Sequence, residues 1–290
     1  MDGFLLINKP CGPSSFQIVS RIRRALHVKK VGHAGTLDPM ASGLLVVALG
    51  NATRLIQYIP SEPKVYQFGI QFGKQTDTLD SEGVVLCQSD IIPGESELRV
   101  VLQKFLGEQE QQPPAFSALK INGVRAYDLA RKGKDVQLEP RKINIYSIQL
   151  LEYDLQTAQA KLEVQCSGGT YVRVLARDIA AELGTCGYAS FINRLGVGNF
   201  NVSSAVNLES CTNLEKYVIS VKEVFDKLPS VEVTTNQNDL INDGRDIELS
   251  ENFQSALNMV FAYKNQKLLA ILKHKEGSVY HPAHVFRIDE

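Results

Sequence analysis

The sequence lacks any apolar run close to the roughly 20 residues that a membrane-spanning helix needs. Its first residues, Met1-Asp2-Gly3, also lack the basic start of a secretory signal. These two absences argue against an integral membrane protein and against an exported one, so we expect a cytoplasmic protein.

Clustered cysteines and histidines are absent as well. The 5 cysteines are widely spaced and form no C-x-x-C pair, so we expect reduced, mostly packed thiols. Of the 5 histidines, only His281 and His284 are close in sequence, and no nearby cysteine completes a zinc set. The sequence therefore argues against a metal site.

A strong net charge of either sign is also missing. The 31 basic and 32 acidic residues give a formal net charge of -1, so a nucleic-acid surface must come from local segregation of charge. The 290 residues, 44% of them hydrophobic and 22% charged, are typical of a globular chain with one large domain and a small one. This composition excludes disorder of the whole chain.

A helix near the amino terminus concentrates positive charge. Ser14 and Ser15 offer an N-cap for it, and residues 20–30 contain five Lys or Arg and no acid. Its apolar face is expected to carry Phe16, Val19, Ile22 and Leu26. A charged helix face is often only solvated, but the position of this one directly before the next motif favours contact with phosphates.

A second basic stretch covers residues 111–142, with seven basic and three acidic side chains and a net charge of +4. Prolines and glycines interrupt it, and only Arg125 to Arg131 has a helical pattern. A long irregular insertion of this kind is either disordered or functional.

The segment from Gly32 to Leu44, GHAGTLDPMASGL, places Asp38 in a turn. Pro39 fixes that turn and biases Asp38 toward an extended conformation. The run Leu44 to Leu49 that follows is typical of a strand buried on both faces. We therefore expect Asp38 at the mouth of the core.

Three interpretations of Asp38 compete. Asp-Pro is a common turn opener whose carboxylate can simply cap backbone amides. An aspartyl-phosphate site needs its acid ahead of the Gly-Thr-Leu string, whereas Asp38 follows that string, so this interpretation is excluded. In the third, Asp38 is the catalytic acid of a deep pocket, which requires partners elsewhere in the chain.

Arg173 is the partner that the helix pattern offers. A helix is expected from Thr170, as its N-cap, to Leu183, with Gly184 ending it. Arg173 then stands in the first turn, where the helix dipole disfavours a cation. A surface ion pair would contribute little, whereas pairing with Asp38 in a dry pocket would hold that acid charged.

Three motifs, in order along nearly the whole chain, resemble the TruB family of pseudouridine synthases: Asn8-Lys9-Pro10, GHAGTLDPMASGLL and Gly169-Thr170-Tyr171-Val172-Arg173. The resemblance implies an α+β fold with a mixed, largely antiparallel central sheet, flanking helices and a small C-terminal β-barrel-like PUA module. It also implies the conversion of uridine to pseudouridine at position 55 in the T loop of tRNA, by base flipping and without a cofactor.

The same resemblance assigns roles to individual side chains. Asp38 becomes the nucleophile or base, and Arg173 supports it. Tyr66 becomes the ring that stacks on the flipped base and His33 the side chain that stabilises displaced nucleotides, with a core aromatic and a structural loop histidine as the alternatives. The remaining implied residues are Tyr171 and Leu195, which wall the pocket, and Lys9 and Pro10, which support the loop from below.

Two features depart from the family pattern. Asn193-Arg194-Leu195 has one arginine where many members carry two. The sequence does not decide whether the contact that the second arginine makes, to a phosphate or within the fold, is kept. From Leu228 to Glu290 there are six Lys or Arg and nine Asp or Glu, a net charge of -3, so this segment can hold RNA only through a local patch.

Periodicity places the other elements. Strands are expected at residues 3–8, 65–73, 143–153 and 161–166, and helices at residues 51–59, 95–106 and 212–226. The polar turn at residues 76–83 closes a hairpin, and its acids are expected to face solvent. Short C-terminal strands are expected at residues 231–233, 260–263, 268–272 and 284–288.

With a domain boundary near Pro229, the family resemblance implies a catalytic domain at residues 1–227, with an RNA-gripping insertion at about 109–142, and a PUA-like accessory RNA-binding domain at residues 228–290. The expected partner is the T-arm stem-loop of tRNA, and the expected state is a monomer. An RNA-binding protein without chemistry and a pseudouridine synthase for another RNA are the alternatives. Whether Asp38 attacks the sugar, adds to the base or removes a sugar proton stays open.

Overall fold

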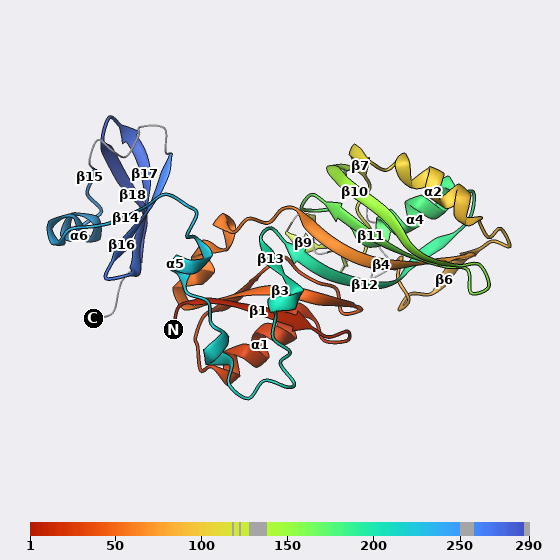
Figure 1. Ribbon diagram of the computed structural model, residues 1–290, viewed down its shortest axis with the longest axis horizontal. Coiled ribbons are helices and arrows are strands. Elements are labelled where there is room, and N and C mark those ends of the chain that lie inside the picture. Colours follow the sequence, from red (N-terminus) through yellow and green to blue (C-terminus); the bar gives the residue numbers. More distant parts are fainter. Residues whose placement is uncertain (118, 122, 128–137, 250–257, 287–290) are drawn as a thin grey trace.

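The computed structural model describes residues 1–117, 119–121, 123–127, 138–249 and 258–286. A nine-stranded sheet forms its centre, and a five-stranded sheet of C-terminal residues lies to one side (Figure 1). No helix within these ranges is long and apolar enough to cross a membrane.

The central sheet runs in the order β1-β3-β12-β4-β11-β10-β7, with β2 paired to β3 and β13 paired to β12. Its pairings are antiparallel except that of β12 with β3, so the sheet is mixed and largely antiparallel, as expected. The strands are β1 (Gly3–Lys9), β2 (Val31–Ala34), β3 (Ala41–Leu49), β4 (Lys64–Phe72), β7 (Gly107–Gln111), β10 (Arg141–Asp154), β11 (Gln159–Cys166), β12 (Gly187–Val197) and β13 (Phe200–Asn201).

Strand β3 is buried on both faces, as its unbroken apolar run predicts. Leu45, Val47 and Leu49 belong to the cluster that α1 covers, whereas Leu44 and Val46 belong to a second cluster that extends to the C-terminal sheet. Because β3 is fixed from both sides, the loop that precedes it is anchored at its end.

Three helices contribute to the first apolar cluster: α1 (Ser15–Ala25), α2 (Glu95–Gln103) and α4 (Val172–Glu182). Ser14 caps α1 in a capping box with Gln17. The expected place of Phe16 on the apolar face is wrong, since its side chain is 68% exposed. With 3.6 residues per turn, Phe16 and the fully buried Ile18 point to nearly opposite sides of the helix.

The expected cap of α4 is also wrong. The hydroxyl of Thr170 donates to the carbonyl of Ser167 at 3.0 Å, and Tyr171 occupies the N-cap position without a side-chain hydrogen bond. The other end is as expected, because Gly184 follows the helix with a φ of 73°.

The single helix expected at residues 212–226 is not formed. Two short pieces, η3 (Leu214–Tyr217) and α5 (Val221–Val224), flank an extended residue, Ile219. Ile219 exchanges two backbone hydrogen bonds with Phe4, at 2.9 and 2.8 Å, so pairing with the edge strand β1 overrides the helical pattern. The short helix expected at residues 51–59 is present as the 3-10 helix η1 (Gly50–Tyr58), and a second 3-10 helix is η2 (Val202–Ser204).

The C-terminal sheet has the order β14-β16-β17-β18-β15. Phe225 connects it to the central sheet, because its ring stacks on Phe261 at 5.1 Å and meets Phe4 edge-on at 5.9 Å. The last strand, expected at residues 284–288, begins earlier, at Val279, and runs to Val285, while residues 287–288 lie outside the described ranges. The elements are β14 (Ser230–Glu232), α6 (Thr235–Asn242), β15 (Ile247–Glu248), β16 (Met259–Lys264), β17 (Lys267–Glu276) and β18 (Val279–Val285).

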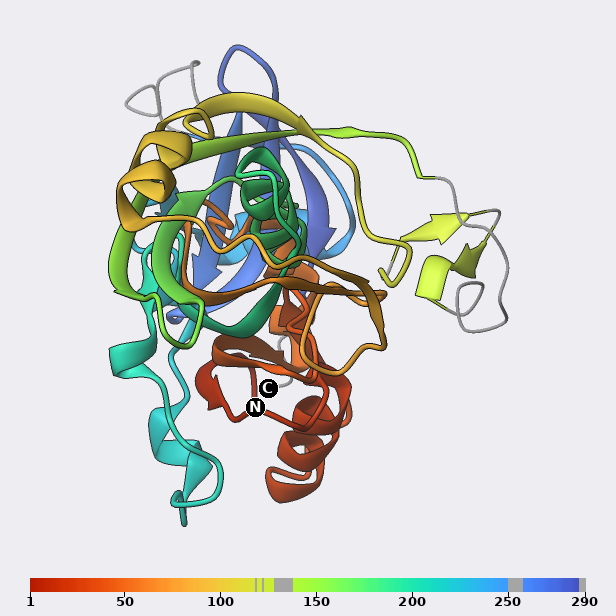
Figure 2. The same cartoon turned by 90° about the vertical axis from the view of Figure 1, so that its right-hand side faces the viewer.

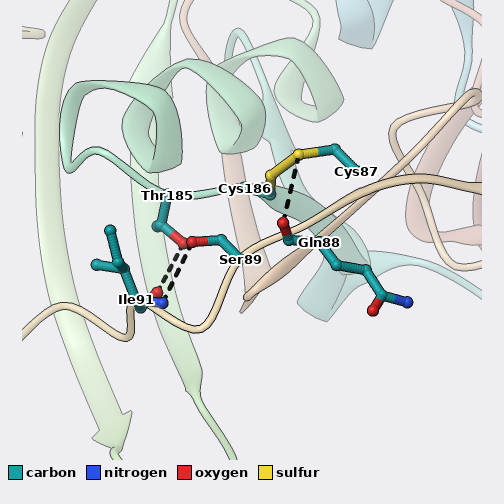
Figure 3. Close-up of a disulfide and its surroundings, with 6 residues drawn as sticks. All are labelled: Cys87, Gln88, Ser89, Ile91, Thr185 and Cys186. Carbon is teal, nitrogen blue, oxygen red and sulfur yellow. Dashed lines mark hydrogen bonds between the residues drawn. A yellow bond between two sulfur atoms is a disulfide. The ribbon is translucent and has the colours of Figure 1, made fainter.

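The hairpin of β5 (Lys74–Thr76) and β6 (Val85–Gln88) folds back toward Cys186, the residue before β12. Cys87 on this hairpin forms a disulfide with Cys186, with an S–S distance of 2.10 Å (Figure 3). The expectation of reduced thiols is therefore wrong for these two cysteines, because the fold brings together residues 99 positions apart. The free cysteines are Cys11, Cys166 and Cys211.

The basic insertion leaves the sheet between β7 and β10, whose residues Gln111 and Arg141 are register partners. Its hairpin of β8 (Lys120–Ile121) and β9 (Val124–Arg125) projects away from the sheet (Figure 2, yellow-green). Of the helix expected from Arg125 to Arg131, Arg125 belongs to β9, Ala126 and Tyr127 are helical, and the last four residues lie outside the described ranges.

Candidate active site

A cavity of about 720 Å³ surrounds Asp38. Four parts of the chain form it: the start of α1, the loop between β2 and β3, the turn between β5 and β6, and the insertion, with α4 behind them. The lining residues are Ser14, Ser15, Phe16, His33, Thr36, Leu37, Asp38, Pro39, Thr78, Asp80, Glu82, Phe116, Ser117, Tyr127 and Arg173.

Backbone hydrogen bonds hold the Asp38 loop in place. The buried hydroxyl of Ser15 both donates to the Leu37 carbonyl and accepts from the Leu37 amide, each at 2.9 Å. The carbonyl of Pro39 accepts from the Gly12 amide at 2.8 Å. Asp38 is thus fixed on both sides, while its own side chain is 42% exposed.

Arg173 binds the Asp38 carboxylate. Its Nε lies 2.9 Å from Asp38 Oδ2, so the pairing predicted from the sequence is present. Its Nη1 donates to the Thr78 carbonyl at 2.6 Å and lies 3.4 Å from Asp80 Oδ2, and its Nη2 donates to the Phe116 carbonyl at 3.1 Å. All three guanidinium nitrogens are therefore engaged on a side chain that is only 6% exposed.

Asp80 is a cavity residue in contact with Arg173 that the sequence did not reveal. It was expected to face solvent, but it is buried, with one oxygen toward Arg173 and the other accepting from the Thr78 hydroxyl at 2.6 Å. The turn is held against β12, because Ala189 donates to the Leu79 carbonyl at 3.0 Å. Leu79, an apolar residue within a polar turn, is the signal that this segment packs inward.

Lys9 lies beneath the loop. Its buried ammonium donates to the carbonyls of Pro10, Pro13 and Pro39, at 2.9, 2.8 and 3.3 Å. Burial lowers the pKa of Lys9 from 10.5 to about 8, partly offset by the charge of Asp38. The ammonium is still mainly charged at neutral pH, and its three hydrogens match the three carbonyls.

His33 lines the cavity from β2. Burial lowers the pKa of its imidazole, and the nearby charge of Arg194 lowers it further, so the ring is neutral at pH 7. Its Nδ1 is buried without a hydrogen-bond partner among the described residues.

Tyr66 stands behind the cavity and does not line it. It is 7% exposed on β4 and belongs to the same apolar cluster as Leu37 and Met40, which flank Asp38. Burial raises the pKa of its hydroxyl, while the charge of Arg194 acts in the opposite direction. In this structure Tyr66 is a core aromatic directly under the loop.

Tyr171 and Leu195 are half-buried and do not line the cavity. The backbone of Tyr171 is held instead by Gln111 at the root of the insertion. Gln111 accepts from the Tyr171 amide at 2.8 Å and donates to the Tyr171 carbonyl at 3.2 Å. No local pattern in the sequence indicates this contact between the insertion and α4.

Arg194 explains the departure at Asn193-Arg194-Leu195. It is buried, and it donates to the carbonyls of Leu44 and Gly35 at 2.8 and 3.0 Å. Gly43 permits this approach of β12 to β3, because an added Cβ would collide with the Arg194 backbone. The one arginine of this segment is therefore structural and ties β12 to both ends of the Asp38 loop.

Comparison with known proteins places this geometry in context. Residues 23–172 match the model of the TruB family pseudouridylate synthase N-terminal domain. The chain is 42% identical over 283 residues to tRNA pseudouridine synthase B of Aquifex aeolicus (strain VF5), covering 96% of this chain and 97% of that protein. It is 36% identical over 302 residues to the protein of the same name from Caulobacter sp. (strain K31), covering 99% and 97%.

Solved structures are similar in fold. A chain in the crystal structure of a Cbf5-Nop10-Gar1 complex matches with a TM-score of 0.70 and 23% identity, over 98% of this chain and 85% of that one. A chain in a Nop10-Cbf5 complex of an archaeal box H/ACA sRNP matches with a TM-score of 0.66 and 23% identity, over 99% and 85%. These likenesses confirm the expected α+β class with an additional small β module.

Proposed function

Because the chain belongs to the TruB family of pseudouridylate synthases and forms pseudouridine in tRNA, we propose that its target is uridine 55 in the T loop. The observation that carries this proposal is the carboxylate of Asp38, held at 2.9 Å by Arg173 in a cavity of about 720 Å³. That volume lies within the range of pockets for small ligands, so it can admit a single extruded nucleotide.

The reaction makes specific demands on the site. The N1–C1′ bond of uridine breaks, the uracil turns without leaving, and C5 joins C1′, while C5 gives up its proton and N1 gains one. Redox state does not change, so the isomerisation itself requires no cofactor. A fixed carboxylate can act as nucleophile or base on such a path, and Asp38 is the side chain proposed for it.

Neighbouring residues supply position and support. Arg173 would keep the Asp38 carboxylate at one place, while Lys9 and Pro10 would hold the loop from below. The neutral ring of His33, which lines the cavity, suits stacking on or hydrogen bonding with a displaced nucleotide.

The base must leave its stack to reach Asp38, at a cost of roughly a few kcal/mol. We propose that Tyr66 stacks on the uracil and that Tyr171 and Leu195 wall the inner pocket, which requires that these three side chains, outside the cavity lining in this structure, become accessible when RNA binds. Stacking on an aromatic ring contributes about 1–3 kcal/mol per base, which offsets much of that cost.

Recognition of the T arm is proposed for the basic insertion, about residues 109–142, within a catalytic domain at residues 1–227. Residues 228–290 would form an accessory RNA-binding domain, because they build a separate five-stranded sheet. The proposed working form is a cytoplasmic monomer bound to one tRNA.

The test is to incubate the purified protein with unmodified tRNA transcript, without added cofactor, and to map pseudouridine by position. We expect modification at uridine 55 alone. The Asp38→Asn variant is expected to bind the transcript and to form no pseudouridine. Glu82→Gln, which changes another carboxylate of the same cavity, is the matched control and is expected to retain activity.

Each alternative has its own outcome in this assay. Appreciable turnover by Asp38→Asn would remove Asp38 from the mechanism. Pseudouridine at another position, or only in another RNA, would reassign the substrate. Tight binding with no pseudouridine by the unaltered protein would indicate an RNA-binding or RNA-folding protein.

A further inference from the structure

Phe16 is a large apolar side chain that the fold leaves in water. It stands in the first turn of α1 and is 68% exposed. The helix does not use it for packing, because the residues that α1 buries are Ser15, Ile18, Val19 and Ile22. An isolated exposed aromatic needs no explanation by itself, so its surroundings decide what it means.

Those surroundings are the Asp38 cavity. Phe16 lines this cavity from α1, whereas Phe116 and Tyr127 line it from the insertion. Aromatic side chains thus reach the cavity from two segments about 100 residues apart in the sequence. Every nucleic-acid base has a π face, and such faces stack on exposed aromatic rings independently of base identity.

Basic side chains continue from Phe16 along the exposed surface of α1. Arg21, Arg23 and Arg24 are all exposed. No ion pair with a carboxylate involves any of the three among the described residues. A helix rises 1.5 Å per residue, so Arg23 lies about 10 Å from Phe16 on the same side. That distance matches about three nucleotides of one strand.

The helix dipole offers another explanation for part of this pattern. Arg23 and Arg24 stand in the last turn of α1, where cations are favoured. The dipole does not account for Arg21, one turn earlier, or for the ring at the other end of the helix. An acidic protein surface would use the arginines but has no need of the ring, whereas RNA uses both.

We infer that Phe16 stacks on an unpaired nucleotide next to the target uridine, while Arg21, Arg23 and Arg24 hold the phosphates leading away from it. Helix α1 is then a second RNA-binding surface, in addition to the basic insertion. Phe16 is a positioning residue in this arrangement, since it fixes the RNA strand that delivers the uracil to Asp38. The inference rests on the proposed function, because it takes RNA to be what enters the cavity.

The first test measures the Kd for unmodified tRNA transcript and the single-turnover rate at saturating tRNA. Phe16→Ala is expected to raise Kd by roughly 5- to 150-fold, as for removal of one base–aromatic stack, and to change the saturated rate much less. Phe16→Trp is expected to keep the affinity, whereas Phe16→Leu, apolar but without a π face, behaves like Phe16→Ala. Tyr217→Ala removes an exposed ring from η3, outside the cavity, and should change neither quantity.

The second test measures how Kd depends on salt. Changing Arg21, Arg23 and Arg24 together to Gln should lower the slope of log Kd against log salt by about 2 to 3, at about 0.7–0.9 for each phosphate that is no longer bound. Phe16→Ala should leave the slope unchanged. A control triple, Lys216, Lys222 and Lys227 to Gln, lies outside the residues that line the cavity and should also leave it unchanged.

Three results would overturn the inference. One is an unchanged Kd for Phe16→Ala in a protein that still forms pseudouridine, which leaves the proposed function intact. Another is full affinity with Phe16→Leu, since apolar contact would then suffice. The third is an equal loss of affinity for poly-glutamate and for tRNA in Phe16→Ala, which would point to an acidic protein partner. If the unaltered protein forms no pseudouridine in any tRNA, the proposed function fails as well, and the Kd series then reports RNA binding alone.

Discussion

At the scale of single residues, the guanidinium of Arg173 is the group that links the separate parts of the site. It connects Asp38, Asp80 and two backbone carbonyls through three nitrogens. A lysine offers one point charge on a flexible stem and cannot meet four acceptors in a plane. The position of the Asp38 carboxylate therefore depends on the shape of this side chain as well as on its charge.

We expect Arg173→Lys to lower kcat about 100-fold, the order of loss that a displacement of about 1 Å in a reacting group can cause. The measurement is single-turnover formation of pseudouridine at saturating tRNA. Arg177→Lys is the control, because Arg177 stands one turn later on α4 and pairs only with its neighbour Asp178 in the described structure. Near-normal turnover by Arg173→Lys would separate Arg173 from the chemistry.

The sequence predicted the Asp38–Arg173 pair but missed Asp80, Arg194 and Ser15. Arg173 was detectable because a cation in the first turn of a helix is locally unfavourable, which indicates that a carboxylate stabilises it. Asp80 lies in a polar turn whose one local sign of inward packing is Leu79, and that sign does not indicate that the turn closes over a buried arginine. Such contacts depend on the tertiary arrangement of distant segments.

At the scale of elements, the insertion contributes both positive charge and part of the cavity wall, where the Phe116 carbonyl accepts from Arg173. Its ends, Gln111 and Arg141, are register partners on β7 and β10, so a short linker can join them without disturbing the sheet. It carries five basic residues between positions 112 and 140, of which Lys120 and Arg125 lie on its described hairpin.

Replacing residues 112–140 by a short glycine-serine linker is expected to weaken tRNA binding and to flatten its salt dependence, by about 0.7–0.9 in log–log slope for each phosphate that the insertion binds. Filter binding at several salt concentrations measures it. Changing Arg99 and Lys104 to Gln is the control, since their charges are already paired with Glu95 and Glu182. An unchanged slope in the linker variant would leave the insertion without a role in phosphate binding.

Elements whose apolar residues recur at a regular spacing were predicted well. Elements whose conformation depends on pairing with a strand distant in sequence were not. The strands at residues 65–73 and 161–166 match β4 and β11 within one or two residues. The helix at residues 212–226 failed because Ile219 pairs with the edge of β1, a partner more than 200 residues away in sequence. Local periodicity contains no information about such an edge.

At the scale of the whole molecule, Phe225 joins the two sheets. Its ring is almost fully buried between Phe4 of the central sheet and Phe261 of the C-terminal sheet.

Phe225→Ala is expected to lower the free energy of unfolding by about 3–5 kcal/mol, as for a buried Phe replaced by Ala. The loss should appear in denaturant unfolding as a separate, earlier transition of the C-terminal sheet. Tyr217→Ala, on the exposed surface of the same connecting segment, should stay within about 0.5 kcal/mol of the original stability. A single transition at the original midpoint in Phe225→Ala would show that other contacts join the sheets.

The disulfide between Cys87 and Cys186 closes a covalent ring that contains the insertion, β10, β11 and α4. A protease that cuts the chain at the exposed residues Gly123 and Val124 would therefore leave two fragments still bonded to each other. They would migrate as one chain in a non-reducing gel and separate only after a reductant is added. The insertion can thus be opened by a single cut while Asp38 and Arg173 remain tethered within one molecule.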